Sequence, residues 1–180
     1  MDVKDLNLKY LGEEVIECIN CGKRSFRVRY YLYEVPYFGT IVLEVGICDE
    51  CEFRRNDVSA VEISEPARIV VKVKRREDLN ALVIKSSKAS IMIPELGIEV
   101  NPGPAAPGYI TTIEGILMNA LDIIPLECFD EGSPCYFKVK EIKEAIEGKI
   151  PFTLIIEDPT GRSDVRGKGL SITREKLTQS

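Results

Sequence analysis

Cys18-Ile19-Asn20-Cys21 and Cys48-Asp49-Glu50-Cys51 are two CxxC pairs, and they decide the fold of the first part of this 180-residue chain. A two-residue gap lets both thiolates of a pair point at one ion. A structural zinc site takes four such ligands in a tetrahedron, each at about 2.3 Å. The spacing therefore predicts one structural Zn²⁺ bound by all four cysteines. Because four thiolates leave no open coordination position, we expect this zinc to stabilise the fold and not to catalyse.

Two disulfides, or a thioredoxin-like redox pair, would use the same cysteines. Neither is favoured, because no βαβ pattern surrounds the pairs and no secretion signal precedes them.

The 26 residues between the pairs predict a long β-hairpin. Residues 25–35 (SFRVRYYLYEV) and 39–47 (GTIVLEVGI) have the composition of strands, and Pro36 and Gly39 mark the turn between them. A hairpin with a metal at its base is a zinc ribbon.

Positive charge follows each CxxC pair. Zn²⁺ with four thiolates carries a formal charge of −2, so local neutralisation is one explanation. A cationic patch that faces a partner is the other, and the sequence leaves both open. The cations concerned are Lys23, Arg24, Arg27, Arg29, Arg54 and Arg55.

Alternation along the first predicted strand places two arginines and two tyrosines on one face. These are Arg27, Arg29, Tyr31 and Tyr33. Such a face could meet the phosphates and bases of a nucleic acid. Pairing of Glu44 with Arg27 or Arg29 across the hairpin is a purely structural alternative.

Composition excludes several classes of function. The chain has no histidine, which removes Ser-His and Cys-His nucleophile pairs and every His-containing metal site. The net charge of −5 arises wholly in residues 77–180, with 11 basic and 16 acidic side chains, while residues 1–76 have 13 of each. Broad nucleic-acid binding needs a basic footprint and is therefore not favoured. With no apolar run near ~20 residues and no signal-peptide pattern, we expect an intracellular, cytoplasmic protein without membrane contact.

After the ribbon, short β-like runs separated by proline and glycine predict a β-sandwich or barrel. These runs are 67–75, 81–87, 89–94, 97–103 and 152–156, and residues 101–108 (NPGPAAPG) are expected to form an exposed loop.

A helical hairpin is predicted between these strands. Thr111 and Glu114 fit a capping box for the first helix, which Pro125 ends. Ser133 as N-cap, with Pro134 at the first helical position, opens a second helix that ends near Gly148.

Cys128 and Cys135 are too far apart in sequence for CxxC geometry and are expected to be buried thiols. No acid/base pair of carboxylates emerges, and no phosphate-binding glycine motif is present, so the sequence predicts no enzymatic activity.

Taken together, these residues resemble the ZPR zinc-finger family. The resemblance runs from about Glu17 to Gly161, and its most specific part is the run from Lys85 to Leu117. The matching stretches are the two CxxC pairs, DLN (78–80), VIKSSKASIMIPELGIEVNPG (83–103), TTIEGIL (111–117) and FTLIIEDPTG (152–161). Arg162 departs from the pattern, since many relatives have asparagine after the D-P-x-G turn.

The resemblance implies a mainly β fold, in which a four-cysteine zinc ribbon is followed by a double-stranded β-helix (cupin-like) domain with an inserted helical hairpin. The expected bounds are 1–65 for the ribbon, 66–180 for the second domain and about 111–148 for the hairpin. A single module is similar to the archaeal form of the family. Without histidine, the second domain lacks the usual cupin metal ligands.

The family implies binding of the elongation factor GTPase that delivers aminoacyl-tRNA, in its GDP-bound or folding form. Candidate contacts are the six ribbon cations and residues of two loops, Pro94, Glu95, Leu96, Pro102 and Gly103. A zinc-ribbon protein that binds nucleic acid is the alternative.

Overall fold

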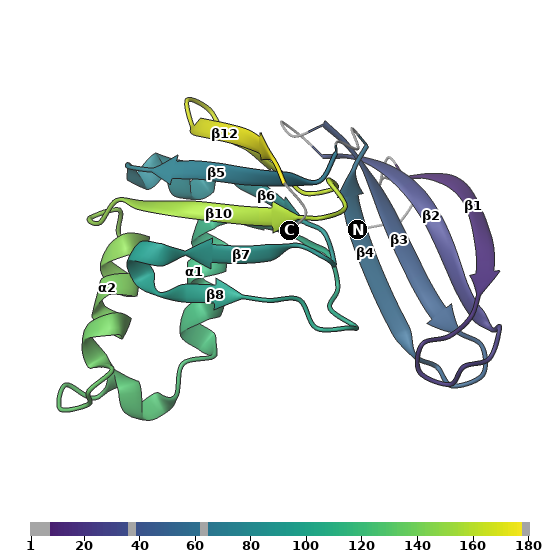
Figure 1. Cartoon of the computed structure of the whole chain (residues 1–180), viewed down its shortest axis with the longest axis horizontal. Coiled ribbons are helices and arrows are strands. Elements are labelled where there is room, and N and C mark those ends of the chain that lie inside the picture. Colours follow the sequence, from purple (N-terminus) through teal and green to yellow (C-terminus); the bar gives the residue numbers. More distant parts are fainter. Residues whose placement is uncertain (1–7, 36–38, 62–64, 178–180) are drawn as a thin grey trace.

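A computed structural model describes residues 8–35, 39–61 and 65–177. A four-stranded antiparallel sheet, the ribbon, stands beside a larger unit of two sheets and two helices (Figure 1). The ribbon has the strand order β1-β2-β3-β4, formed by β1 (Leu8–Ile16), β2 (Phe26–Val35), β3 (Gly39–Cys48) and β4 (Arg54–Ala60).

The predicted hairpin strands are confirmed as β2 and β3, which pair from Phe26 opposite Cys48 to Val35 opposite Gly39. Pro36, the predicted turn residue, lies outside the described residues. β1 was not expected from the sequence, because its nine residues are mostly exposed and lack a clean apolar alternation. It pairs along β2 and places Glu13 opposite Arg29.

The second unit, the jelly roll, has a mainly β fold as expected. A five-stranded sheet in the order β12-β5-β10-β7-β8 faces a three-stranded sheet in the order β11-β6-β9. The strands are β5 (Ala67–Val73), β6 (Leu82–Lys85), β7 (Ser90–Ile93), β8 (Ile98–Val100), β9 (Tyr109–Thr112), β10 (Phe152–Asp158), β11 (Asp164–Arg166) and β12 (Ser171–Lys176).

Alternation along these strands supplies the core. In β5, for example, Ile69, Val71 and Val73 are almost fully buried, and they meet residues of both sheets and both helices in one apolar cluster. Residues 171–176, in the polar closing stretch, form β12 along β5.

Two helices connect β9 to β10: α1 (Ile113–Asp122) and α2 (Tyr136–Ile146). Short 3₁₀ turns lie at η2 (Arg76–Asn80), η3 (Pro94–Leu96) and η4 (Leu126–Phe129). Among the described residues, no helix is long and apolar enough to cross a membrane.

The helix starts differ from the expected ones. The N-cap of α1 is Thr112 and not Thr111, and its hydroxyl accepts a hydrogen bond from the backbone N–H of Gly115 at 3.0 Å. α2 begins at Tyr136, three residues after the expected cap Ser133, and no side chain caps it. It ends at Ile146, close to Gly148 as expected, and this glycine has the left-handed φ of 74° that commonly follows the end of a helix.

Cys128 and Cys135 form a disulfide, so the expectation of two separate thiols was wrong. The 3₁₀ turn η4 folds the connection between the helices back on itself. This brings the two Cα atoms to 5.0 Å, a separation typical of disulfides.

Candidate metal centre

The four cysteines of the CxxC pairs come together at one end of the ribbon. Cys18 and Cys21 lie in the loop from β1 to β2, whereas Cys48 is the last residue of β3 and Cys51 lies in the turn from β3 to β4. Their Sγ atoms all fall within 4.8 Å of one another, with Cys18 to Cys51 at 3.7 Å and Cys21 to Cys48 at 3.8 Å. Tetrahedral zinc with bonds of about 2.3 Å places its sulfurs ~3.8 Å apart. The cluster is therefore positioned to bind a zinc ion.

The two loops have the same backbone hydrogen bonds. In the first, Cys18 N–H donates to the Lys23 carbonyl and Gly22 N–H donates to the Cys18 carbonyl, both at 2.8 Å. In the second, Cys48 N–H donates to the Phe53 carbonyl at 2.9 Å and Glu52 N–H donates to the Cys48 carbonyl at 3.0 Å. Each loop thus presents its two thiols in the same way, which is how two local turns build one tetrahedral site.

Both loops turn at a left-handed residue, which is Gly22 in the first (φ 71°) and Glu52 in the second (φ 57°). Glycine adopts this conformation freely, whereas a residue with a Cβ pays about 1–2 kcal/mol for it. The second loop therefore carries backbone strain that the first avoids.

Contacts at two of the four sulfurs, those of Cys48 and Cys51, favour thiolates. The Ser25 hydroxyl lies 3.2 Å from Cys48 Sγ, and this contact, with backbone N–H groups of the loop, lowers the pKa of the Cys48 thiol to about 6. The Asn20 amide donates to Cys51 Sγ at 3.4 Å and lowers the pKa of that thiol. Since zinc binds thiolates, both contacts prepare the site for the metal.

A small apolar cluster supports the site from within the ribbon. Phe26 and Val28 are buried beside Cys18 and Cys48, and the Phe26 ring lies 5.9 Å from that of Phe53. A Cβ on Gly46 would come within 2.3 Å of the Phe26 ring, so glycine at this position makes room for the aromatic side chain.

Three of the predicted cationic contacts are already ion-paired. Lys23 pairs with Glu50 at 2.7 Å, and Arg27 and Arg29 share Glu13 at 2.8 and 3.2 Å. These arginines lower the pKa of Glu13. The expected pairing of Glu44 with Arg27 or Arg29 was wrong, because the β2–β3 register places Glu44 beside Tyr30 on the opposite face.

The other three ribbon cations differ in exposure and in their contacts. Arg24 and Arg54 are exposed near the cysteines, whereas Arg55 is half-buried and donates to the Ser87 hydroxyl of the jelly roll at 3.1 Å.

The two jelly-roll loops that were predicted to contact a partner do not form one continuous surface with the ribbon cations. Pro94, Glu95 and Leu96 form η3, which contacts α2 at the end of the jelly roll remote from the ribbon (Figure 1). Leu96 is 3% exposed within the core, so its side chain is not accessible to a partner. Glu95 accepts a hydrogen bond from the Thr153 hydroxyl at 2.8 Å. Pro102 and Gly103 lie in the loop that leads back toward the ribbon.

Sequence reasoning missed the polar contacts at the junction of the two units. Asp57 of β4 accepts hydrogen bonds from the backbone N–H and the hydroxyl of Ser87, at 3.0 and 2.5 Å. Arg162 donates to Glu44 at 3.0 Å. A buried apolar contact, formed by Ile41 and Val58 of the ribbon and Ile84 of β6, accompanies them. The only sequence signal was that Ser87 and Arg162 lie in or beside stretches that resemble the family.

Comparison with known proteins agrees with this structure. Residues 13–65 match the family model described as the ZPR1 zinc-finger domain, and residues 77–180 match the one described as the ZPR1 jelly-roll domain. An uncharacterized ZPR1-like protein of Methanocaldococcus jannaschii is 38% identical over 161 residues, which cover 86% of this chain and 81% of that protein. One of Pyrococcus horikoshii is 34% identical, covering 89% and 78%.

A eukaryotic relative carries a functional name. The zinc finger chaperone zpr1 of Schizosaccharomyces pombe is 34% identical over 143 residues, covering 73% of this chain but only 31% of the yeast protein. The human zinc finger protein ZPR1 is 31% identical, covering 82% and 34%. This chain therefore spans about a third of these longer relatives.

Proposed function

Since the chain belongs to the ZPR1 zinc-finger family, we propose that it is a zinc-binding adaptor or folding factor for the elongation factor GTPase that delivers aminoacyl-tRNA. The form that it binds is the GDP-bound or the folding form. The observation that carries the proposal is its 34% identity, over 73% of its length, to a protein named a zinc finger chaperone. A cytoplasmic location follows from this partner and is part of the proposal.

The metal centre supports a binding role over a catalytic one. All four ligands come from the chain, so a bound zinc has no position left for water or substrate. The zinc supplies bonds that tie two loops together, and the relatives' names describe zinc finger proteins and a chaperone.

The charge arrangement on the ribbon supports a protein partner over a nucleic acid. The Arg27 and Arg29 guanidinium groups, which would otherwise meet phosphates, are held by Glu13 and, for Arg27, also by Asp49 at 3.0 Å. We propose Arg24, Arg54 and Lys23 near the cysteines as contacts, together with Pro102 and Gly103. The division into units 1–65 and 66–180, with the hairpin at about 111–148, belongs to the same proposal.

A binding titration tests the proposal. The zinc-loaded chain is titrated by calorimetry against the elongation factor of its own organism, with GDP, with GTP and without nucleotide. We expect binding that is tightest with GDP or with the nucleotide-free, partly folded factor. If the chain binds the factor in none of these states and does not raise the yield when the factor is refolded from urea, the proposal is wrong.

The nucleic-acid alternative has its own signature. Binding to RNA would weaken steeply with salt, with log affinity falling about 0.7–0.9 per phosphate contact for each tenfold rise in salt. We expect no such binding at physiological salt, and a slope equivalent to several phosphate contacts would favour the alternative.

A further inference from the structure

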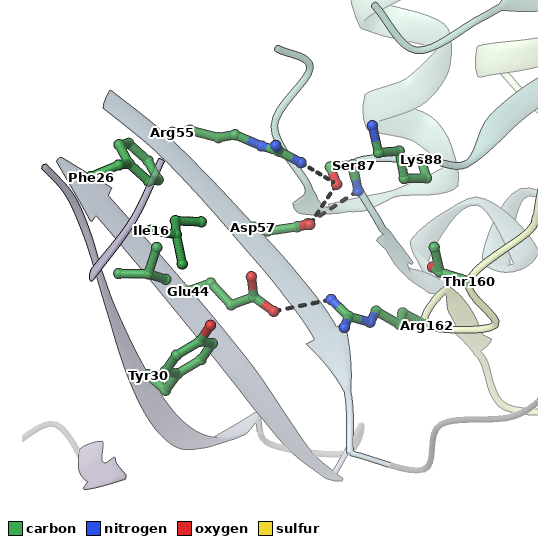
Figure 2. Close-up of a pocket in the computed structure, with 11 residues that line it drawn as sticks. Ile16, Phe26, Tyr30, Glu44, Arg55, Asp57, Ser87, Lys88, Thr160 and Arg162 are labelled. Atoms are coloured by element: carbon green, nitrogen blue, oxygen red, sulfur yellow. Dashed lines mark hydrogen bonds and ion pairs between the residues drawn. The ribbon is translucent and has the colours of Figure 1, made fainter. Parts of the chain in front are cut away.

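A cavity of about 260 Å³ lies between the ribbon and the jelly roll (Figure 2). Its ribbon wall is mixed: Ile16 of β1 and Phe26 and Val28 of β2 are apolar, whereas Tyr30, Glu44, Arg55 and Asp57 are polar or charged. Its other wall is polar and comes from two loops of the jelly roll, which contribute Ser87 and Lys88, and Thr160. The cavity therefore combines an apolar part on β1 and β2 with polar and charged groups from both units, and it exists only where the units meet.

The carboxylates at the cavity are already occupied. Asp57 accepts three hydrogen bonds, from Ser87 N–H, the Ser87 hydroxyl and Val58 N–H. Glu44 accepts one from Arg162 across the junction, as Figure 2 shows. These contacts hold the walls in place, and among the residues that the structure describes neither carboxylate forms an ion pair with the other cations of the cavity, although Arg55, like Arg162, acts against the burial that raises the pKa of Glu44.

Arg55 and Lys88 are those cations. Arg55 extends from β4 toward the turn that carries Ser87 and Lys88, and it uses one N–H for the Ser87 hydroxyl at 3.1 Å (Figure 2). Within the described part of the chain, neither Arg55 nor Lys88 forms an ion pair. A guanidinium has five N–H donors in a planar fork, so most donors of Arg55 remain available.

We propose that this cavity binds a carboxylate carried on an apolar stem. The carboxylate would lie against Arg55 and Lys88, and the stem against Phe26, Val28 and Ile16. The guanidinium fork fits a carboxylate with two parallel hydrogen bonds. A singly charged group is favoured over a phosphate dianion, because Glu44 and Asp57 are close enough to repel additional negative charge. Small organic acids and the acidic side chains of polypeptides both offer this chemistry.

The first experiment uses 3-phenylpropionate as the probe and the zinc-loaded full-length chain. Backbone amide signals of Ser87, Lys88 and Thr160 are followed by NMR during the titration. We expect them to shift and saturate, and we expect the neutral isostere 3-phenylpropanamide to leave them unchanged. Equal shifts with the amide, no shifts with the acid, or tighter binding of inorganic phosphate would each overturn the proposal.

Lys88→Gln is the test variant, because Lys88 is exposed and its replacement leaves the core intact. Loss of one charge-assisted hydrogen bond should raise the dissociation constant about tenfold. Lys140→Gln, an exposed lysine of α2 away from the cavity, is the matched control and should leave the constant unchanged. An unchanged constant in Lys88→Gln would contradict the assignment.

A second arm separates the two sources of carboxylate. The peptides acetyl-Leu-Glu-Leu-amide and acetyl-Leu-Gln-Leu-amide are titrated under the same conditions. Binding of the glutamate peptide alone would support a polypeptide ligand, and binding of 3-phenylpropionate without either peptide would support a small organic acid. Because no elongation factor is present, failure here is distinct from failure of the proposed function.

Discussion

Arg162 of the jelly roll donates to Glu44 of the ribbon over 3.0 Å, joining two residues that lie 118 positions apart in the sequence. The Arg162 carbonyl also accepts a hydrogen bond from Ala60 N–H of β4, so this residue contacts the ribbon through both its side chain and its backbone. Burial raises the pKa of Glu44 more than the nearby guanidinium lowers it. Arg162 therefore offsets part of the cost of burying the Glu44 carboxylate.

Arg162→Gln should destabilise the chain more than the double variant Glu44→Gln/Arg162→Gln. The single change leaves a half-buried carboxylate without its cation, at a cost of about 1–2 kcal/mol, whereas the double change removes the charge as well. Urea unfolding of the zinc-loaded proteins measures this difference. Equal destabilisation by the two variants would show that the ion pair does not matter to the junction.

Asp158 is predicted to stabilise the loop that carries Arg162. Its carboxylate is 1% exposed and accepts five hydrogen bonds from Thr160, Arg162 and Ser163, which together keep its pKa low although burial raises it. Asp158→Asn replaces one of the two acceptor oxygens with an NH₂ donor and should cost about 2–3 kcal/mol at pH 7.

The pH dependence of this cost has a definite sign. A lowered pKa contributes stability that is present above the ordinary aspartate value of 3.8 and is lost as pH falls through the lower folded value. The difference in unfolding free energy between wild type and Asp158→Asn should therefore be constant from pH 8 to pH 5 and shrink below 3.8. A difference that shrinks already between pH 8 and 5 would contradict this account.

Gly108 is predicted to be required at the junction. A Cβ there would lie 2.0 Å from Asp57 Oδ1 and 2.8 Å from Val58 N, so the two units could not approach as they do. Gly108→Ala should lower the unfolding free energy by about 1–3 kcal/mol through this overpacking. Gly103→Ala, in the same loop with open space around it, is the control and should change it little. Thermal unfolding midpoints of the two variants test this prediction, and similar midpoints for Gly108→Ala and Gly103→Ala would refute it.

Substitutions at Gly22 and Glu52 are expected to change zinc affinity in opposite directions. Gly22→Ala introduces a Cβ at φ 71° with nothing within 4 Å, so only backbone strain is added. About 1 kcal/mol of strain should weaken zinc binding about fivefold. Glu52→Gly should strengthen zinc binding, because it relieves the equivalent strain in the other loop. Competition with a chromophoric chelator measures both affinities, and a change in the same direction for both variants would count against the paired-loop interpretation.

The metal centre was the part of the molecule that the sequence predicted best. The CxxC spacing is local, and the turns that present Cys18 and Cys48 depend on only a few neighbouring residues. The β2–β3 hairpin was predictable for the same reason, since alternation and turn residues are short-range signals. The helix caps were less certain, because Thr111 and Thr112 are adjacent residues with the same capping chemistry.

Long-range contacts were not predictable. β1 lacks an apolar alternation, and it is held by its ladder with β2 and by Glu13 bonding to Arg27 and Arg29. The same contacts change how the arginine face of β2 is interpreted. Arg27 and Arg29 are neutralised by Glu13 of β1, a strand that the sequence pattern did not predict. The Cys128–Cys135 disulfide likewise depends on the path of η4 between two helices.

The central claim is that a zinc-held ribbon binds the elongation factor, and its most direct test compares the zinc-loaded chain with the same chain stripped by a chelator. Binding to the GDP-bound factor is measured for both, and zinc is then restored. We predict that zinc removal weakens binding at least about hundredfold, ~2.7 kcal/mol, because the ribbon loses its fold, and that added zinc restores it. Equal affinity with and without zinc would contradict the claim.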